Sequence, residues 1–313
     1  MTSAFERTKA HIGINEIKKT EELMMNVYEI YFSPTGGTRK VAAFLAQEMN
    51  TEPGQIDLSD NRTDFHGIAL TSEDVAVIAV PSYSGRVPVP AVKRIMQIRG
   101  NGAKAILVCV YGNRAYEDTL IELQDCVQQA GFSVVAAVAA VAEHSIARRY
   151  AANRPDQEDY RQLKEFAGKI LDKLNHGDTA MPVIPGNRPY RKAGNVGLIP
   201  GITKQCTKCG LCASKCPVGA INKENPAQVN KKVCISCMRC VAICPHHARK
   251  INGFLLFIVN RMLKKYVLQE KNVNCIFDDV WKLRIEDKKK ALFRQRFFLN
   301  FGKKTRKRKF ICP

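Results

Sequence analysis

The sequence predicts a doubly wound α/β domain with a parallel sheet, followed by a small cysteine-rich α+β domain. Three observations carry this prediction: a length of 313 residues, alternating strand and helix signals in the first half, and a cysteine motif that occurs twice in the second half. A chain of this length usually forms more than one domain. We therefore expect two folded units with a linker and extensions.

Apolar runs typical of strands alternate with helix-like patterns in the first half of the chain. Strands are expected at 27–32, 75–80, 105–110 and 134–141, and helices at 38–49, 89–98, 116–130 and 157–174. The runs at 75–80 and 105–110 are nearly continuous, as in strands buried on both faces. Alternating βα units predict a parallel sheet covered by helices on both sides.

The composition divides the chain into five parts. We expect an N-terminal extension at 1–25, the α/β domain at 26–178, an irregular linker rich in Pro and Gly at 179–203, the cysteine-rich domain at 204–250, and a basic C-terminal extension at 251–313. Proline and glycine without periodicity are typical of loops, which supports the linker.

The cysteine repeat is the strongest functional signal. Both copies have the spacing C-x2-C-x2-C-x3-C-P and end at Pro217 and Pro245. In such a run three thiolates wrap one [4Fe-4S] cluster and the fourth binds the other cluster. The spacing thus predicts one cluster on Cys206, Cys209, Cys212 and Cys244, and a second on Cys234, Cys237, Cys240 and Cys216.

Structural zinc is the alternative for this motif, because zinc sites also use C-x2-C pairs, although they do not need the x3-C-P ending twice. The repeat resembles bacterial two-cluster ferredoxins over residues 203–250, including the Pro-Val-Gly-Ala-Ile turn at 217–221. The other cysteines are expected to be buried or incidental thiols: Cys109, Cys126, Cys275 and Cys312.

A second signal lies between the first strand and the first helix, at residues 31–40. The hydroxyls and glycines there, next to a helix N-terminus, favour binding of a phosphate group. The loop has neither the triphosphate nor the dinucleotide motif. It resembles the FMN-phosphate loop of flavodoxins, and the alternative is a helix start capped by Thr38 without a ligand. The candidate residues are Ser33, Thr35, Gly36, Gly37 and Thr38.

Two further loops, 81–88 and 111–116, should flank a flavin at the carboxyl ends of the strands. Candidates there are Tyr83 and Tyr116 for ring packing, and Gly85, Gly112 and Asn113 for backbone approach or hydrogen bonds. Ordinary surface packing explains each tyrosine nearly as well. Residues 143–145, which include His144, are a weaker candidate for the flavin edge.

A flavodoxin-like domain followed by a two-cluster ferredoxin domain resembles the eubacterial ferredoxin/flavodoxin fusion family. The resemblance implies an electron-transfer protein that passes electrons between FMN and two [4Fe-4S] clusters, with no catalytic acid or base. The alternative is a flavin-dependent oxidoreductase of the quinone or flavin reductase type, fed by its own clusters. A nucleic-acid-binding module is a third possibility, based on the net charge of +20, but no groove-reading motif is present.

Charge and cysteine usage bear on partners and location. Residues 249–313 carry 19 Lys or Arg against 5 Asp or Glu, so the tail is either a docking surface for an acidic redox partner or, as we favour, a solvated extension. No apolar run reaches the roughly 20 residues of a transmembrane helix. Twelve cysteines without a leader-like start favour metal or redox chemistry in the cytoplasm over a disulfide framework.

Overall fold

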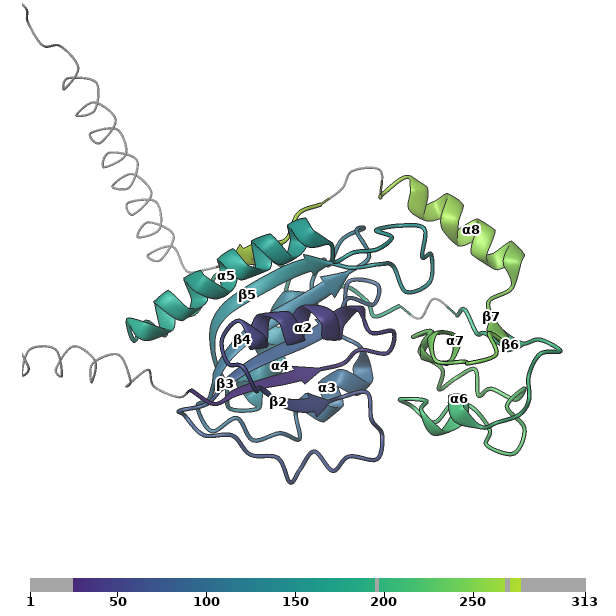
Figure 1. Cartoon of the computed structure of the whole chain (residues 1–313), viewed down its shortest axis with the longest axis horizontal. Coiled ribbons are helices and arrows are strands. Elements are labelled where there is room, and N and C mark those ends of the chain that lie inside the picture. Colours follow the sequence, from purple (N-terminus) through teal and green to yellow (C-terminus); the bar gives the residue numbers. More distant parts are fainter. Residues whose placement is uncertain (1–24, 195–196, 268–270, 277–313) are drawn as a thin grey trace, which may run out of the picture.

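The computed structural model describes residues 25–194, 197–267 and 271–276 (Figure 1). Most of the predicted N-terminal extension and the basic run near the C-terminus, including Cys312, lie outside the described residues. The fold below is built from the three described segments.

The first domain is a parallel sheet of five strands that gains a sixth, antiparallel strand from the C-terminal part of the chain. The order β2-β1-β3-β4-β5-β8 contains the 2-1-3-4-5 arrangement of flavodoxin-like proteins, so the predicted fold class is confirmed. The strands are β1 (Val27–Tyr31), β2 (Gly54–Asp57), β3 (Val75–Pro81), β4 (Lys104–Tyr111), β5 (Ser133–Val141) and β8 (Asn274–Ile276).

Helices cover both faces of this sheet, as the alternating signals predict. The helices α2 (Gly37–Gln47) and α5 (Gln157–Asn175) pack on one face, and α3 (Val89–Ile95) and α4 (Thr119–Gln129) on the other. Residues of β3 alternate between the two cores: Val75 and Val77 belong to one, Ala76 and Ile78 to the other. All four are completely buried, which explains the continuous apolar run.

The cysteine-rich domain is small and has an internal repeat. A two-stranded antiparallel sheet of β6 (Gly201–Ile202) and β7 (Arg249–Lys250) flanks two short helices, α6 (Leu211–Ser214) and α7 (Arg239–Ala242). Its apolar core is small, and its main cluster has four buried members: Ala213, Cys216, Ala220 and Ile221. A domain with so few buried groups needs additional links to be stable.

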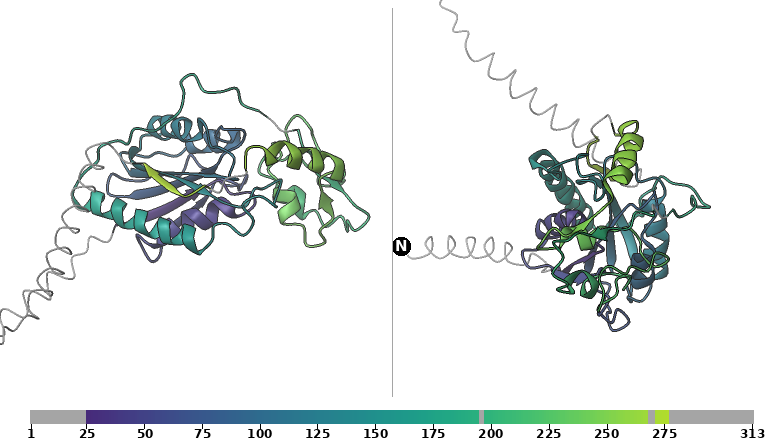
Figure 2. Two further views of the ribbon diagram at one scale, coloured as in Figure 1. Left: turned by 90° about the horizontal axis from the view of Figure 1, so that it is seen from above. Right: turned by 90° about the vertical axis from the view of Figure 1, so that its right-hand side faces the viewer.

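The chain returns to the first domain after the cysteine-rich domain (Figures 1 and 2). The helix α8 (Gly253–Lys264) follows β7, and β8 then pairs with β5, with Cys275 opposite Val138. These elements fall in the predicted C-terminal extension, so its described part is not the solvated tail that we expected. Within the described residues, no helix is both long and apolar enough to cross a membrane.

Candidate cofactor sites

A cavity of about 610 Å³ lies at the carboxyl ends of the parallel strands. The loops that follow β1, β3, β4 and β5 all contribute to its wall, where a flavodoxin-like sheet binds its ligand. We call it the strand-end cavity. Six of the predicted flavin contacts line it: Thr35, Gly37, Thr38, Tyr83, Gly85 and Gly112. Four others do not: Ser33, Gly36, Asn113 and Tyr116.

Hydrogen bonds hold the loop after β1 in place next to the strand-end cavity. The Ser33 N–H donates to Ser59 Oγ at 2.8 Å, and Ser33 Oγ accepts from the Arg39 N–H at 2.9 Å. Gly36, with φ of 94°, is the N-cap residue of α2 and has no side chain, so the Ser33 hydroxyl is the side-chain acceptor at this helix start. Thr38 is therefore not the cap that the ligand-free alternative required. A helix N-terminus on a cavity wall favours an anion such as phosphate, because its first N–H groups have no partner inside the helix.

The loop after β3 is a two-residue hairpin turn. The Tyr83 N–H donates to Arg86 O at 2.9 Å, and the Arg86 N–H donates to Tyr83 O at 3.1 Å. The two residues of the turn, Ser84 and Gly85, have φ of 53° and 78°. A β-carbon on Gly85 would lie 2.8 Å from Glu117 Cβ, so glycine is required there. Burial raises the pKa of Tyr83, which keeps its hydroxyl protonated.

The loops after β4 and β5 meet at Gly112 and His144. A β-carbon on Gly112 would lie 2.6 Å from His144 Cδ2, so the glycine permits close approach of the imidazole. His144 Nδ1 accepts from the N–H groups of Ile146 and Ala147 at 3.2 and 3.1 Å, which assigns its proton to Nε2. Burial lowers the pKa of His144 to about 4, and the charge of Arg114 acts in the same direction. His144 therefore lines the cavity as a neutral donor.

Asn113 and Tyr116 have packing roles next to the cavity. Asn113 is 3% exposed, and its Oδ1 accepts from the Lys271 N–H at 3.1 Å, which ties the loop after β4 to the segment before β8. Tyr116 packs edge-on against Tyr111, with ring centroids 5.5 Å apart. Their contacts to a flavin remain predictions.

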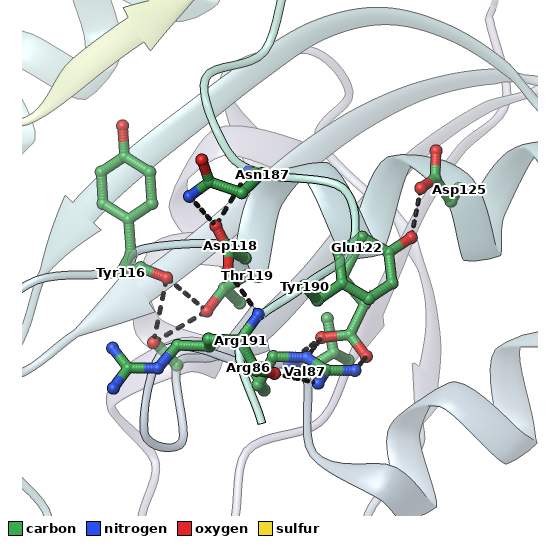
Figure 3. Close-up of polar contacts among 11 residues, drawn as sticks. Arg86, Val87, Tyr116, Asp118, Thr119, Glu122, Asp125, Asn187, Tyr190 and Arg191 are labelled. Atoms are coloured by element: carbon green, nitrogen blue, oxygen red, sulfur yellow. Dashed lines mark hydrogen bonds and ion pairs between the residues drawn. The ribbon is translucent and has the colours of Figure 1, made fainter. Parts of the chain in front are cut away.

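The predicted linker is irregular but docks on α4, as Figure 3 shows. Asp118 accepts from the Asn187 and Arg191 N–H groups at 2.9 and 2.8 Å, and these bonds, the one from Arg191 foremost, lower the pKa of its carboxyl. Arg86 forms a partly buried ion pair with Glu122 at 2.7 Å on the same side. Docking brings three linker residues to the cavity wall: Arg191, Ala193 and Gly194. Sequence reasoning missed them because no local pattern marks them.

The eight cysteines of the repeat line two separate cavities. The outer cysteine set, around one cavity, comprises Cys206, Cys209, Cys212 and Cys244. The inner cysteine set, around the other, comprises Cys216, Cys234, Cys237 and Cys240. This grouping is the one that the spacing predicts for two clusters, with the fourth cysteine exchanged between the halves.

The two halves of the repeat have matching backbone conformations that bend the chain around each set. Lys208 and Ser236 have φ of 56° and 54°, and Gly210 and Met238 have φ of 75° and 61° at the starts of α6 and α7. The Ala220 N–H donates to Cys216 Sγ at 3.3 Å, and the Ala248 N–H donates to Cys244 Sγ at the same distance. Such N–H···S bonds stabilise thiolate ligands of iron-sulfur clusters.

The two sets differ in their exposure. Cys209 of the outer set is exposed, whereas Cys216 and Cys237 of the inner set are buried. Burial raises the pKa of Cys237 and of Cys240 to about 12, so a cationic group such as iron is needed to bind them as thiolates. Among the described residues, no group of three or more His, Cys, Asp or Glu side chains is positioned to hold a single metal ion.

The inner cysteine set faces the first domain. The Asn61 side chain donates to Cys216 O at 3.0 Å, and Arg94 donates to Pro217 O at 2.6 Å. Ile235 and Ser236, which lie between two inner cysteines, line both the inner cavity and the strand-end cavity. Three residues of α8 complete the wall of the strand-end cavity: Val259, Met262 and Leu263.

Comparison with known proteins identifies the family of the cysteine-rich domain. Residues 205–249 match the family of 4Fe-4S dicluster domains. A ferredoxin-like protein in the nif region of Rhizobium leguminosarum bv. trifolii is 43% identical over 51 residues, which cover 14% of this chain and 80% of that protein. The iron-sulfur cluster-binding subunit of menaquinone reductase from Nitratidesulfovibrio vulgaris is 31% identical over 122 residues, or 37% of this chain. The match spans only 40% of that subunit.

The fold of the first domain is also found among solved structures. An archaeal flavodoxin is similar with a TM-score of 0.37 and 14% identity, over 49% of this chain and 100% of the flavodoxin. The fold assignment itself rests on the strand order. Fold and cysteine sites together define an iron-sulfur electron-transfer protein with a flavodoxin-like domain. Through residues 205–249 the chain belongs to the ferredoxins.

Proposed function

We propose that this protein passes electrons between an FMN in the strand-end cavity and two [4Fe-4S] clusters. The cluster on the inner cysteine set would exchange electrons with the flavin directly. One observation carries the proposal: Ile235 and Ser236 line both the strand-end cavity and the inner cavity. A single layer of side chains thus separates the two candidate cofactor sites. Short separation through protein is what electron transfer between cofactors requires.

The residues around the strand-end cavity suit a flavin mononucleotide. Thr35, Gly37 and Thr38 at the start of α2 would receive the phosphate, because backbone N–H groups and the helix dipole favour an anion there. The neutral His144 would donate from Nε2 to a ring acceptor. The volume of about 610 Å³ lies within the range of small-molecule sites.

The order of the carriers follows from burial. The inner set is covered by the first domain, whereas Cys209 of the outer set is exposed. We therefore assign the outer cluster to exchange with a partner protein. When bound, FMNH₂ would supply two electrons and release two protons to solvent, and each cluster would accept one electron. The chain itself separates the two candidate sites by Ile235 and Ser236.

Cofactor analysis is the first test. Protein purified without oxygen should contain about eight iron ions, eight sulfide ions and one FMN per chain. Zinc in place of iron would reject the proposal, and iron without flavin would restrict the electron path to the clusters. Rapid turnover of quinones or free flavins by the loaded protein would favour the flavin-dependent oxidoreductase instead.

The order of the carriers has its own test with two matched variants. Cys234→Ser removes an inner ligand, and Cys209→Ser removes an outer one. After flash reduction of the flavin, we expect fast electron arrival at a cluster in the wild type and in Cys209→Ser, but not in Cys234→Ser. The wild-type rate should not depend on protein concentration. Equal effects of the two substitutions would contradict the proposed order.

A further inference from the structure

Arg249 breaks the internal repeat of the cysteine-rich domain. The two copies align with an offset of 28 residues, so that Cys216 corresponds to Cys244 and Ile221 corresponds to Arg249. Ile221 is 7% exposed and Arg249 is 2% exposed. A guanidinium group is therefore buried where the other half of the domain buries an aliphatic side chain.

The contacts of Arg249 leave its charge uncompensated by protein. Its Nη1 donates to Pro200 O at 3.0 Å, and its Nη2 donates to Pro226 O and to Cys212 Sγ, the latter at 3.6 Å. Among the described residues, its buried Nε has no hydrogen-bond partner, and the partners of its other two nitrogens are carbonyl oxygens and a sulfur, not carboxylates. A buried cation is costly unless an anion lies nearby.

The position of Arg249 indicates which anion that would be. Arg249 lines both the outer and the inner cavity, whereas Ile221 lines only the inner one. A [4Fe-4S] cluster with four thiolates carries net negative charge in both of its working oxidation states, and reduction adds one more negative charge. A fixed cation in a low-dielectric interior therefore favours the reduced form.

We propose that Arg249 raises the reduction potentials of both clusters by holding a buried positive charge between them. This inference rests on the cluster half of the proposed function and does not require FMN. The bond from Nη2 to Cys212 Sγ adds a second effect on the outer cluster, because hydrogen bonds to ligand sulfurs also raise the potential. Arg249 touches a ligand sulfur and tunes the clusters without taking part in proton transfer.

The test is an EPR-monitored redox titration of Arg249→Ile, which installs the residue of the corresponding position in the first repeat. We expect unchanged iron and sulfide content and more negative potentials for both clusters. Arg249→Lys, which keeps the charge, should stay closer to the wild type. The matched control is Lys250→Ile, which removes an exposed charge from the same strand. Its shift should be smaller and should vanish in about 1 M salt, where surface charges are screened.

Several outcomes would overturn the inference. One is an Arg249→Ile protein with intact clusters whose potentials match those of Lys250→Ile. If Arg249→Ile does not retain iron, Arg249→Gln and Arg249→Lys decide, because both keep a donor and only lysine keeps the charge. Equal potentials in these two variants would reject the charge effect. A wild type without iron would instead reject the proposed function.

Discussion

His144 is held in one protonation state by its surroundings in the strand-end cavity. Burial disfavours the imidazolium and lowers the pKa from 6.5 to about 4, while two backbone N–H groups point at Nδ1. Between these pH values the unfolded chain binds a proton that the folded chain does not. Stability due to this residue is therefore present above pH 6.5 and is lost as the pH falls towards 4.

Replacing His144 with Asn tests this contribution of His144 to the pH dependence of stability. The Asn oxygen can accept the same two backbone bonds but does not titrate. We expect His144→Asn to flatten the pH dependence of the free energy of unfolding by about 2 kcal/mol between pH 6.5 and 4. Urea titrations of both proteins at matched cofactor content would measure it. An unchanged slope would show that the imidazole charges without cost.

Glu29 is a second residue whose charged form is disfavoured by its position in the structure. It lies in the middle of β1, is completely buried, and neither carboxylate oxygen has a hydrogen-bond partner among the described residues. Burial raises the pKa of Glu29, and Arg39 only partly opposes this effect. The folded state thus holds the proton to a higher pH than the unfolded state, and stability decreases as the pH rises above 4.5 through the folded pKa.

We expect Glu29→Gln to raise the free energy of unfolding at pH 7 by about 1 kcal/mol and to leave it nearly unchanged at pH 4, where Glu29 is protonated. Unfolding of the two proteins at both pH values provides the measurement. Destabilisation at pH 7 would instead indicate that the carboxylate has a favourable partner.

At the scale of elements, α8 divides its residues between the cavity and solvent. None of its residues is buried, and Phe254 and Phe257 are 71% and 62% exposed. Leu263 lies on the other part of the helix surface and lines the strand-end cavity. The helix therefore acts as part of the cavity wall and not as part of either core.

This division predicts different effects on FMN binding. Leu263→Ser removes apolar surface from the wall and should weaken FMN binding by about 1.4 kcal/mol, roughly tenfold in Kd. Phe254→Ser on the same helix should leave Kd unchanged, because that side chain does not line the cavity. Quenching of flavin fluorescence measures both constants. Equal weakening by the two variants would indicate a general loss of the helix.

The elements differ in how readily the sequence predicts them. The buried strands β3 and β4 were predicted within about two residues, because continuous apolar runs are a local signal. The strands β2 and β8 were not predicted, because they are short edge strands; β2 has no buried residue and β8 spans three residues. The cysteine grouping follows from spacing alone.

The wall of the strand-end cavity was only half predictable. Thr35, Tyr83 and Gly112 follow strands, and the carboxyl ends of parallel strands converge, so their meeting could be expected. Ile235 and Leu263 lie far away in the sequence and reach the wall only because the second domain folds back onto the first. No local pattern encodes such long-range packing.

At the scale of the whole molecule, the cysteine-rich domain is inserted in the chain between two elements of the first domain, α5 and β8. The chain leaves after α5 and comes back to place β8 beside β5. The domain boundaries at 204 and 250 remain predictions, but β8 shows that the first domain includes residues from both sides of the second.

This double attachment bears on how the molecule behaves when it is diluted or cut. A module joined at both ends keeps a high local concentration next to its neighbour, whatever the total amount of protein. After a single proteolytic cut between α5 and β6, the ferredoxin domain would be held to the first domain by non-covalent contacts, among them the pairing of β8 with β5. In the intact chain the cysteine-rich domain and the strand-end cavity therefore stay next to each other at any dilution.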